Sequence, residues 1–475
     1  MPARPGWRLP VGLMLGAFIA LLDVSIVTVA LPDIGDDLNT GTSGMQWIVD
    51  AYTLLLSALL LSSGALGDRW GRKRAYLAGV TVFTLASLAC AAAPTVGALI
   101  AARAVQGAGA ALVFTGTLSN LVQAYPEPRE RARMLGLNGA VAGLAIVAGP
   151  LLGGVLVDTL GWRGIFVINL PVGLAALWLG ARAIPETSDP EHAAFDPAGQ
   201  VLGLVMLGTL TYGLIESHEY GWSSVQTRTA LAVAAAAAAG FVLAERRGAR
   251  PMLPLHLFRD SRFTVPNVAS FVLGFGTSAV FFLLSLYLQQ VQDHSALSTG
   301  LRFLPLTLSL SAVSPFATRL CARFRTSTVM TAGYAVSGAA LFGLALLATD
   351  TGFWPFAALS VLLGVGMGAS IGPTQLAGVA ALPVQRSGLA AACISTTRQV
   401  GTALGVAVLG LIVASHAGSD LGSEQYAHGF VRGLHIAGLA TGVASLAAAG
   451  LIAASARHHR PAADRAATST SAASV

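Results

Sequence analysis

The sequence predicts an all-α integral membrane protein with about fourteen transmembrane helices. Hydrophobic residues make up 54% of the 475-residue chain and charged residues only 11%, whereas ordinary soluble proteins carry about 25% charged residues. The apolar residues form runs long enough to cross a bilayer as a helix, which takes about 20 residues, and the charged residues lie mostly between these runs. Lipid is therefore the expected solvent of most of the chain.

The first apolar run follows a short basic segment. No small-residue cleavage site comes after it, so we expect a retained helix and not a signal peptide. Five further runs follow, and all six are assigned to an N-terminal six-helix bundle, residues 1–190. The six spans are expected at 11–31, 46–66, 75–94, 96–123, 134–157 and 164–184.

Two further apolar runs, at 197–215 and 228–244, form a separate linking pair within residues 191–250. Six more runs are assigned to a C-terminal six-helix bundle, residues 251–456, and the Ala-, Ser- and Thr-rich residues 457–475 are expected to be a disordered cytoplasmic tail. A basic loop after the second span is weakly echoed after the tenth, which indicates two halves related as repeats by pseudo-two-fold symmetry. The last six spans are expected at 264–287, 298–317, 328–348, 353–373, 394–415 and 433–455.

The orientation follows from the positions of the basic residues, which concentrate in cytoplasmic loops. When the loops are assigned alternately to two sides, 22 of the 28 Lys and Arg residues fall on the side of the N-terminus. Both termini are therefore expected in the cytoplasm, which requires an even number of spans. The expected location is the cytoplasmic (inner) cell membrane.

Several function classes are not supported. The net charge of +6 does not indicate a nucleic-acid partner, because the basic residues are scattered between apolar runs. A phosphate-binding P-loop needs a Gly-Lys-Ser/Thr ending, and the single lysine, Lys73, lies between arginines. The three cysteines match no metal site and most histidines lie in loops, so we expect neither an enzyme nor a metal or other cofactor.

The loop after the second span reads Gly64-Ala65-Leu66-Gly67-Asp68-Arg69-Trp70-Gly71-Arg72-Lys73-Arg74. Its glycines allow a helix to end and to approach a neighbour closely. Asp68 can accept hydrogen bonds from an arginine or from the N-terminus of a nearby helix. The alternative is a plain basic loop that only sets the topology. The candidate gating residues are Gly64, Gly67, Asp68, Arg69, Gly71 and Arg72.

Besides Arg182 near the end of the sixth span, three charged residues lie inside expected spans of the first half. Asp23 lies in the first span, and an ionised carboxylate there costs at least about 2.5 kcal/mol unless it is paired or protonated. Arg103 in the fourth span needs an acid or carbonyl groups around it, and Gln106 shares its helix face. Asp50 opens the second span. Asp23 can be functional or a structural hydrogen-bonding group, and Asp50 can be a second acid or merely interfacial.

The fifth span contains Gly143, Gly149, Pro150 and Gly153. A proline within a helix removes one hydrogen bond and bends it, and the glycines allow close packing. Tight packing alone is the alternative interpretation.

These motifs together resemble the major facilitator superfamily, and specifically its fourteen-helix drug:proton antiporter family. The segments Trp162–Gly173 and Ser395–Gly401 support the same resemblance, which runs from about Val11 to Ser455. It implies the major facilitator fold, with two extra central helices, and it identifies the glycine-proline helix as typical of exporting antiporters. The sequence departs from the family pattern at Arg319, which stands where the first half has Asp68, and at Asp50, where the family more often has a small hydroxyl residue.

The expected function is therefore proton-coupled antiport that exports small lipophilic or cationic drug-like compounds by alternating access. Asp23, Asp50 and Arg103 are the candidates for proton coupling. Candidate residues of the substrate cavity are Ser25, Gln106, Asn138, Arg398 and Gln399. The resemblance implies a monomer whose partners are the substrate, protons and the bilayer. A proton-coupled symporter that imports a sugar or metabolite is the alternative, and narrow antibiotic export and broad multidrug export both remain open.

Overall fold

The computed structural model describes residues 6–188, 196–248, 253, 255–382, 387–418 and 423–458. Within these ranges fourteen helical segments are long and apolar enough to cross a membrane, as the sequence predicts. The expected disordered tail lies outside the described residues from position 459 onward, whereas Arg457 and His458 continue the last helix.

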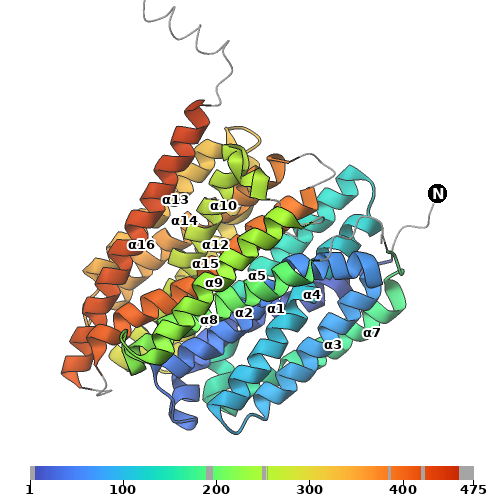
Figure 1. The fold of residues 1–475 in the computed structure, drawn as a ribbon. Coiled ribbons are helices and arrows are strands. Elements are labelled where there is room, and N and C mark those ends of the chain that lie inside the picture. The colour runs from blue at the N-terminus through green and yellow to red at the C-terminus, as the bar shows by residue number, and fades with distance from the viewer. Residues whose placement is uncertain are drawn as a thin grey trace, which may run out of the picture.

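The N-terminal part of the chain forms six spans, and the sixth is divided at Ile168 into a short and a longer helix (Figure 1). The helices alternate in direction, so that each begins where the previous one ends. They are α1 (Arg8–Asp37), α2 (Thr42–Trp70), α3 (Arg72–Ala91), α4 (Val96–Ala124), α5 (Pro128–Leu160), α6 (Gly164–Val167) and α7 (Asn169–Ala183).

Two helices, α8 (Pro197–Tyr220) and α9 (Val225–Arg247), pack against each other and connect the two parts of the chain. In Figure 1 they cross the middle of the view between the blue N-terminal and the orange-red C-terminal helices. Trp47 of α2 donates a hydrogen bond to Glu216 of α8 at 2.8 Å, and Gln200 of α8 donates to the Ala58 carbonyl at 2.9 Å. Polar contacts therefore attach α8 to the N-terminal helices.

The C-terminal part also forms six spans, and the first of these is interrupted by two π-helical turns. It consists of α10 (Ser261–Leu273), η2 (Gly274–Ser278), α11 (Ala279–Leu286) and η3 (Tyr287–Val291), preceded by the 3₁₀ turn η1 (Leu255–Arg259). Single π turns inside helices are rare. The remaining elements are α12 (Ala296–Leu320), α13 (Thr326–Gly343), η4 (Leu344–Leu346), α14 (Phe353–Ala380), α15 (Ser387–Ala417) and α16 (Glu424–His458).

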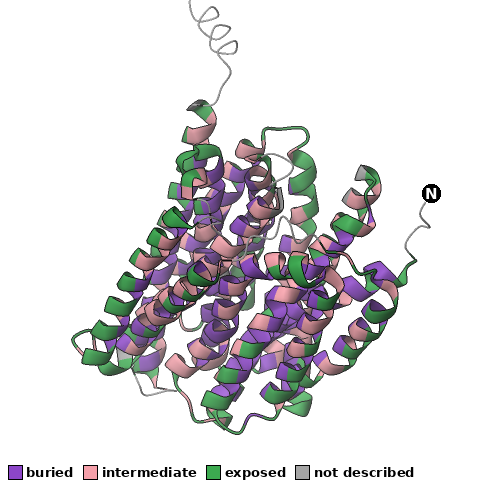
Figure 2. Cartoon of the chain, turned by 45° about the vertical axis from the view of Figure 1, so that its right-hand side comes forward, coloured by how far each residue is buried: buried purple, intermediate pink, exposed green. Residues whose placement is uncertain are grey.

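Most helices are longer than the apolar runs that predict them. The first span was expected to end at Leu31, before Pro32, but α1 continues through this proline to Asp37. The lost hydrogen bond bends a helix without necessarily ending it. Buried residues lie mainly on the inward faces of the helices, and exposed residues lie at the ends and on the outer surface (Figure 2).

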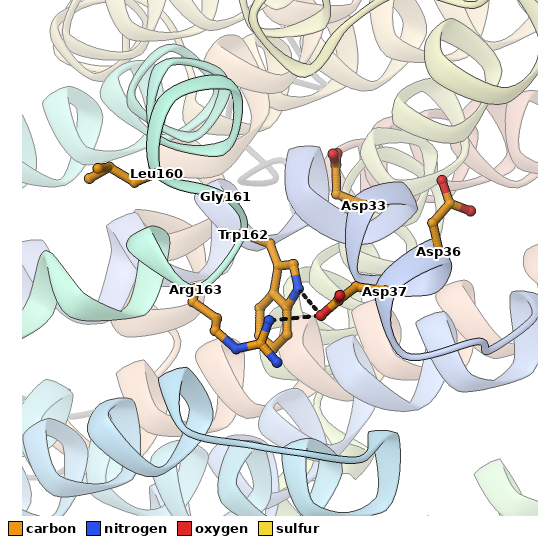
Figure 3. Close-up of a pocket in the computed structure, with 7 residues that line it drawn as sticks. All are labelled: Asp33, Asp36, Asp37, Leu160, Gly161, Trp162 and Arg163. Atoms are coloured by element: carbon orange, nitrogen blue, oxygen red, sulfur yellow. Dashed lines mark hydrogen bonds and ion pairs between the residues drawn. The ribbon is translucent and has the colours of Figure 1, made fainter.

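Two ends of the bundle can be distinguished by charge. The end that holds the start of α1 and the loop after α2 carries Arg8, Arg72 and Arg74, and it is called the basic end here. The other end, called the opposite end, holds Asp33, Asp36 and Asp37. One of these carboxylates is hydrogen-bonded: Asp37 accepts from Trp162 at 3.0 Å and from Arg163 at 2.7 Å. The three aspartates line a surface pocket together with Trp162 and Arg163 (Figure 3).

Candidate functional site

The central polar feature of the structure is an ion pair between Asp23 of α1 and Arg103 of α4. Arg103 donates from Nη1 to Asp23 Oδ2. Asp23 is 0% and Arg103 is 1% exposed, so neither charge reaches the surface. Asp23 is the sixteenth residue of the 30-residue helix α1, near its middle. The structure therefore brings together the acid and the base that the sequence predicts to be buried in the membrane.

A ring of neutral side chains completes the hydrogen bonding of this pair. Asp23 Oδ1 accepts from Gln106 at 2.9 Å and from Asn169 at 3.1 Å. Gln106 also accepts from Arg103 at 2.6 Å, and its amide donates to Ser87 at 2.7 Å. Each of these side chains is buried. The network joins α1, α3, α4 and α7, so a change of charge at Asp23 acts on four helices.

The guanidinium of Arg103 has two further partners on α2. Its Nε donates to the carbonyl of Ile48 at 3.1 Å, and its plane lies 4.4 Å from the ring centre of Tyr52. A cation at this distance from an aromatic ring is attracted to the ring face. The Tyr52 hydroxyl in turn donates to the carbonyl of Ala20 on α1 at 3.0 Å. Arg103 is thus held by α1, α2 and α4 together.

Asp50 on α2 has no such surroundings. It is 0% exposed, and neither carboxylate oxygen has a hydrogen-bond partner among the described residues. Its burial between helices does not depend on its depth in the bilayer, so both possibilities that the sequence leaves open for Asp50 stay predictions. The carboxyl group is buried in the bundle without a neighbouring cation, in contrast to Asp23.

Helix α5 lies between α1 and α12, and its glycines face both neighbours. On the side of α1, a Cβ added to Gly149 would lie 1.9 Å from Ser25 Oγ, and one added to Gly153 would lie 3.0 Å from Ile26. Ser25 also bonds to the carbonyls of Leu22 and Ala145. The side chain of Ser25 therefore packs between α1 and α5.

On the side of α12, the contact is as close. A Cβ on Gly154 would lie 2.5 Å from Leu297 Cα, and one on Gly300 would lie 2.2 Å from the carbonyl oxygen of Pro150. Nearer the basic end, Ser311 donates to the carbonyl of Gly143 at 3.3 Å. The glycine-proline helix thus forms a direct backbone-to-backbone contact between the two parts of the chain.

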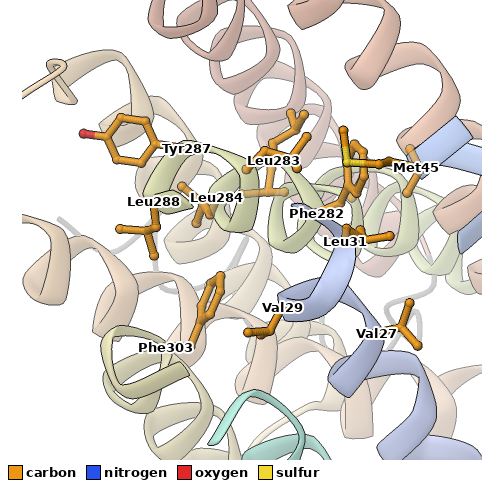
Figure 4. Packing of buried hydrophobic residues seen from close by; sticks show 14 of the residues in the cluster. Val27, Val29, Leu31, Met45, Phe282, Leu283, Leu284, Tyr287, Leu288 and Phe303 are labelled. Atoms are coloured by element: carbon orange, nitrogen blue, oxygen red, sulfur yellow. The ribbon is translucent and has the colours of Figure 1, made fainter. Parts of the chain in front are cut away.

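At the opposite end, the N-terminal and C-terminal helices share one hydrophobic core. Figure 4 shows Val27, Val29 and Leu31 of α1 packed among Phe282 and Leu283 of α11 and their neighbours.

Hydrogen bonds cross between the two parts at the same place. Ser285 donates to the Thr28 carbonyl at 2.7 Å, Gln289 to the Val29 carbonyl at 2.9 Å, and Gln46 of α2 to the Val406 carbonyl of α15 at 2.9 Å. The opposite end is therefore closed.

At the basic end, the cores of the two parts are separate. One cluster contains only N-terminal residues, such as Leu13, Tyr76 and Leu121, and another only C-terminal ones, such as Val265 and Tyr334. The two parts are therefore packed together at the opposite end, whereas at the basic end they belong mostly to separate clusters. There Leu61 of α2 packs against Phe263, Ala390 and Cys393 of the C-terminal part.

The hydrogen bonds of the predicted gating loop join residues of the N-terminal part of the chain. Arg72 donates to Asp68 at 2.7 Å, and its backbone N–H donates to the Thr187 carbonyl at 2.9 Å. Gly71 adopts a φ of +113°, which favours glycine, and a Cβ there would lie 2.5 Å from Glu186. Arg69 is exposed, and Gly64 and Gly67 have room around them.

The candidate cavity residues occupy different environments. Gln106 is part of the buried network, and Ser25 contacts α5. Asn138 of α5 is partly exposed, although its Oδ1 is buried and has no partner among the described residues. Arg398 and Gln399 are partly exposed on α15. Among the described residues, no hydrogen bond joins any two of these five side chains, and their assignment to a substrate cavity stays a prediction.

Ser87, Asn169 and Gln46 were not predicted as site residues. Each is a buried polar side chain in an otherwise apolar span, and each bonds across helices. Their burial in the membrane is the signal that could have identified them, because polar side chains there need partners. Which helix supplies the partner depends on packing.

Known proteins resemble this chain in sequence and in fold. The family model of the Major Facilitator Superfamily matches residues 13–406. The chain is 37% identical over 407 residues to the multidrug resistance protein Stp of Mycobacterium tuberculosis (strain CDC 1551 / Oshkosh), covering 86% of this chain and 76% of that protein. It is 37% identical over 408 residues to the methylenomycin A resistance protein of Streptomyces coelicolor, covering 86% of each.

A solved structure has the same fold. It is a bacterial homologue of the human lysosomal transporter Spinster in an inward-facing and unoccupied conformation, and it matches with a TM-score of 0.69. The match covers 96% of this chain and 98% of that one at 17% sequence identity.

Proposed function

The chain belongs to the major facilitator superfamily, and from this premise we propose that it exports small drug-like compounds in exchange for protons. Members of this family are membrane transporters and not enzymes, and the relatives are named as resistance and export proteins. These names favour export of a drug or antibiotic over import of a sugar or metabolite. The concentration of basic residues at the basic end supports placing that end, with both termini, in the cytoplasm.

The observation that carries the proton coupling is the buried pair of Asp23 and Arg103. In the described conformation the pair is neutral as a whole, because carboxylate and guanidinium cancel. A proton taken up by Asp23 would leave Arg103 without its counter-charge in a medium where an unpaired charge is costly. Since Arg103 also binds α2, the four-helix network would then rearrange, which couples protonation to the motion of helices.

Asp50 supports a second proton site in the same half. A buried carboxyl group without a cation or a hydrogen-bond donor is accommodated far better as the neutral acid than as the anion. Asp23 and Asp50 thus have opposite surroundings in one conformation: a guanidinium lies beside Asp23, and Asp50 has neither a cation nor a hydrogen-bond donor beside it among the described residues.

Alternating access follows from the glycine-lined contact of α5 with α12 and from the two ends of the bundle. The cytoplasmic substrate would enter where the two cores are parted, and the contacts of Gln46, Ser285 and Gln289 would break when the opposite end opens. We propose that the monomer carries out the whole cycle.

The test uses proteoliposomes with an acidic lumen and three probes: ethidium, phenylnaphthylamine and anilinonaphthalene sulfonate. We expect at least one probe to accumulate in the lumen while the lumen becomes more alkaline, as exchange requires. Transport of a probe without any change of lumen pH would overturn proton coupling. Movement of the probe and protons in the same direction would favour the symporter alternative.

Substitutions of the two acids test which of them carries a transported proton. Asp23→Asn is expected to stop accumulation against a gradient while downhill exchange of the probe continues. Asp50→Asn mimics the neutral acid, so a variant that folds as the wild type but couples less efficiently would place a transported proton there.

A further inference from the structure

Arg398 is a charged side chain well inside helix α15 that the proposed proton pathway does not use. It is the twelfth residue of the 31-residue helix α15, which places it about 16 Å from the start of the helix at 1.5 Å per residue. In the described helices from α10 to α16, it is the only Asp, Glu, Lys or Arg more than ten residues from both ends of its helix.

The guanidinium of Arg398 has no protein partner in the described part of the chain. No ion pair or hydrogen bond involves it, whereas Arg103 binds Asp23, Gln106 and the Ile48 carbonyl. The Arg398 backbone carbonyl accepts a hydrogen bond from the Thr402 hydroxyl at 3.1 Å, and this bond does not involve the guanidinium. The neutral Tyr334 hydroxyl, bonded to Thr374 at 3.2 Å, is the titratable group that interacts with Arg398 electrostatically.

The turn that holds Arg398 is not fully buried, although α15 is an interior helix. Helices α2, α8, α10, α14 and α16 all contact α15, yet the six residues from Ser395 to Val400 are each partly exposed. Ser395 lies one turn before Arg398 on the same face, and its hydroxyl also has no partner among the described residues. Two hydrogen-bond donors without a partner among the described residues therefore lie one turn apart on the same face of α15.

The charged side chains inside the spans differ in how exposed they are. Asp23 is neutralised by Arg103, and Asp50 is 0% exposed. The preference for cations that the sequence suggests depends on accessible carboxylates, and neither acid is accessible in this conformation. Of these three charged residues and Arg398, the partly exposed one is Arg398, and its charge is positive. An unpaired guanidinium inside a span needs water or an anion, and arginine binds carboxylate and similar planar anions through paired hydrogen bonds.

We propose that Arg398, assisted by Ser395, binds an anionic group of the exported compound, so that the transporter selects lipophilic acids. This inference rests on the proposed function, because it concerns the substrate of the same export cycle. The carboxylate, sulfonate or enolate of the substrate would supply the counter-charge that the protein does not, while the apolar part of the compound would occupy the space between the two helix groups.

The test uses two dyes with the same aromatic framework, the anion anilinonaphthalene sulfonate and the neutral phenylnaphthylamine. Transport of each is measured in proteoliposomes with an imposed pH gradient. Arg398→Gln is expected to raise the KM for the anion about tenfold or more, the loss expected for a charge-assisted hydrogen bond, with less change for the neutral dye. Arg398→Lys should restore part of the transport of the anion.

Arg302→Gln is the matched control, because it removes another partly exposed arginine of the same half, close to the opposite end and beside Phe353. It should leave the ratio of the two KM values unchanged. Equal loss of both dyes in Arg398→Gln would indicate a structural role and overturn the inference. A wild type that carries only the neutral dye would overturn it while the proposed export stands, and a wild type that carries neither dye would count against both.

Discussion

At the scale of single residues, three charged groups in the membrane have three different surroundings. In the part of the chain that the structure describes, Asp23 is paired and hydrogen-bonded, Asp50 is buried without a hydrogen-bond partner, and Arg398 is partly exposed without one. Breaking a buried ion pair by removing one charge costs about 3–5 kcal/mol, whereas removing both charges costs much less. Stability and coupling can therefore be separated at the Asp23–Arg103 pair.

The double variant Asp23→Asn with Arg103→Gln is predicted to unfold near the wild-type temperature but to have lost proton-driven transport. Asp23→Asn alone should lose coupling and also stability, because it leaves Arg103 buried and uncompensated. Thermal unfolding in detergent and gradient-driven transport in proteoliposomes measure the two effects. A double variant that still accumulates its probe would remove this pair from the proton pathway.

The sequence alone predicts that Asp23 and Arg103 are buried and require partners, because charges inside an apolar run have few alternatives. It cannot choose between Asp23 and Asp50 as the partner of Arg103, since both lie in apolar spans of the same half. The choice depends on which helix faces α4 at that level, and this follows from tertiary packing. The contributions of Ser87 and Asn169 depend on the same packing.

At the scale of helices, α5 determines how closely the two parts of the chain approach. Gly149 and Gly153 face α1, while Gly154 faces α12. The sequence predicts the bend and the close packing of this helix from its glycines and proline. The sequence does not predict that α5 packs closely against two different helices on two of its faces. It also does not predict the π turns η2 and η3, which have no clear sequence signal.

Gly154→Ala is predicted to disfavour the described conformation by about 1–3 kcal/mol, the usual cost of overpacking, because its Cβ would lie 2.5 Å from Leu297 Cα. Gly139→Ala in the same helix is the control, since nothing lies within 4 Å of the added Cβ. The control should gain about 0.5–1 kcal/mol from the better helix former. Differential scanning fluorimetry and turnover measure both, and equal shifts in the two variants would contradict the packing argument.

At the scale of the whole molecule, the fourteen spans and their alternation follow from hydropathy alone, as the structure confirms. The packing of the two parts at the opposite end and their separation at the basic end could not be predicted. A sequence that supports two conformations does not indicate which of them is populated. The proposed cytoplasmic location of the basic end can be tested with a residue that the chain already has.

Cys321 follows α12 at the basic end and is partly exposed, whereas Cys90 and Cys393 are buried. A membrane-impermeant maleimide is therefore predicted to label Cys321 in inverted vesicles and not in intact cells. Burial raises the pKa of the Cys321 thiol above its usual value. Because the thiolate is the reactive form, labelling should be slow at neutral pH and should accelerate as the pH rises towards that higher pKa. Cys321→Ser is the control, and labelling of intact cells would reverse the proposed orientation.

The unpaired guanidinium of Arg398 has an electrical consequence. If a compound with one negative charge leaves the cell while one proton enters, each cycle transfers a net two positive charges into the cell. At about 2.3 kcal/mol per charge per 100 mV, a membrane voltage of that size supplies about 4.6 kcal/mol, compared with about 1.4 kcal/mol from one pH unit. Such a pump would continue to expel acids in alkaline surroundings, where the pH difference alone opposes it.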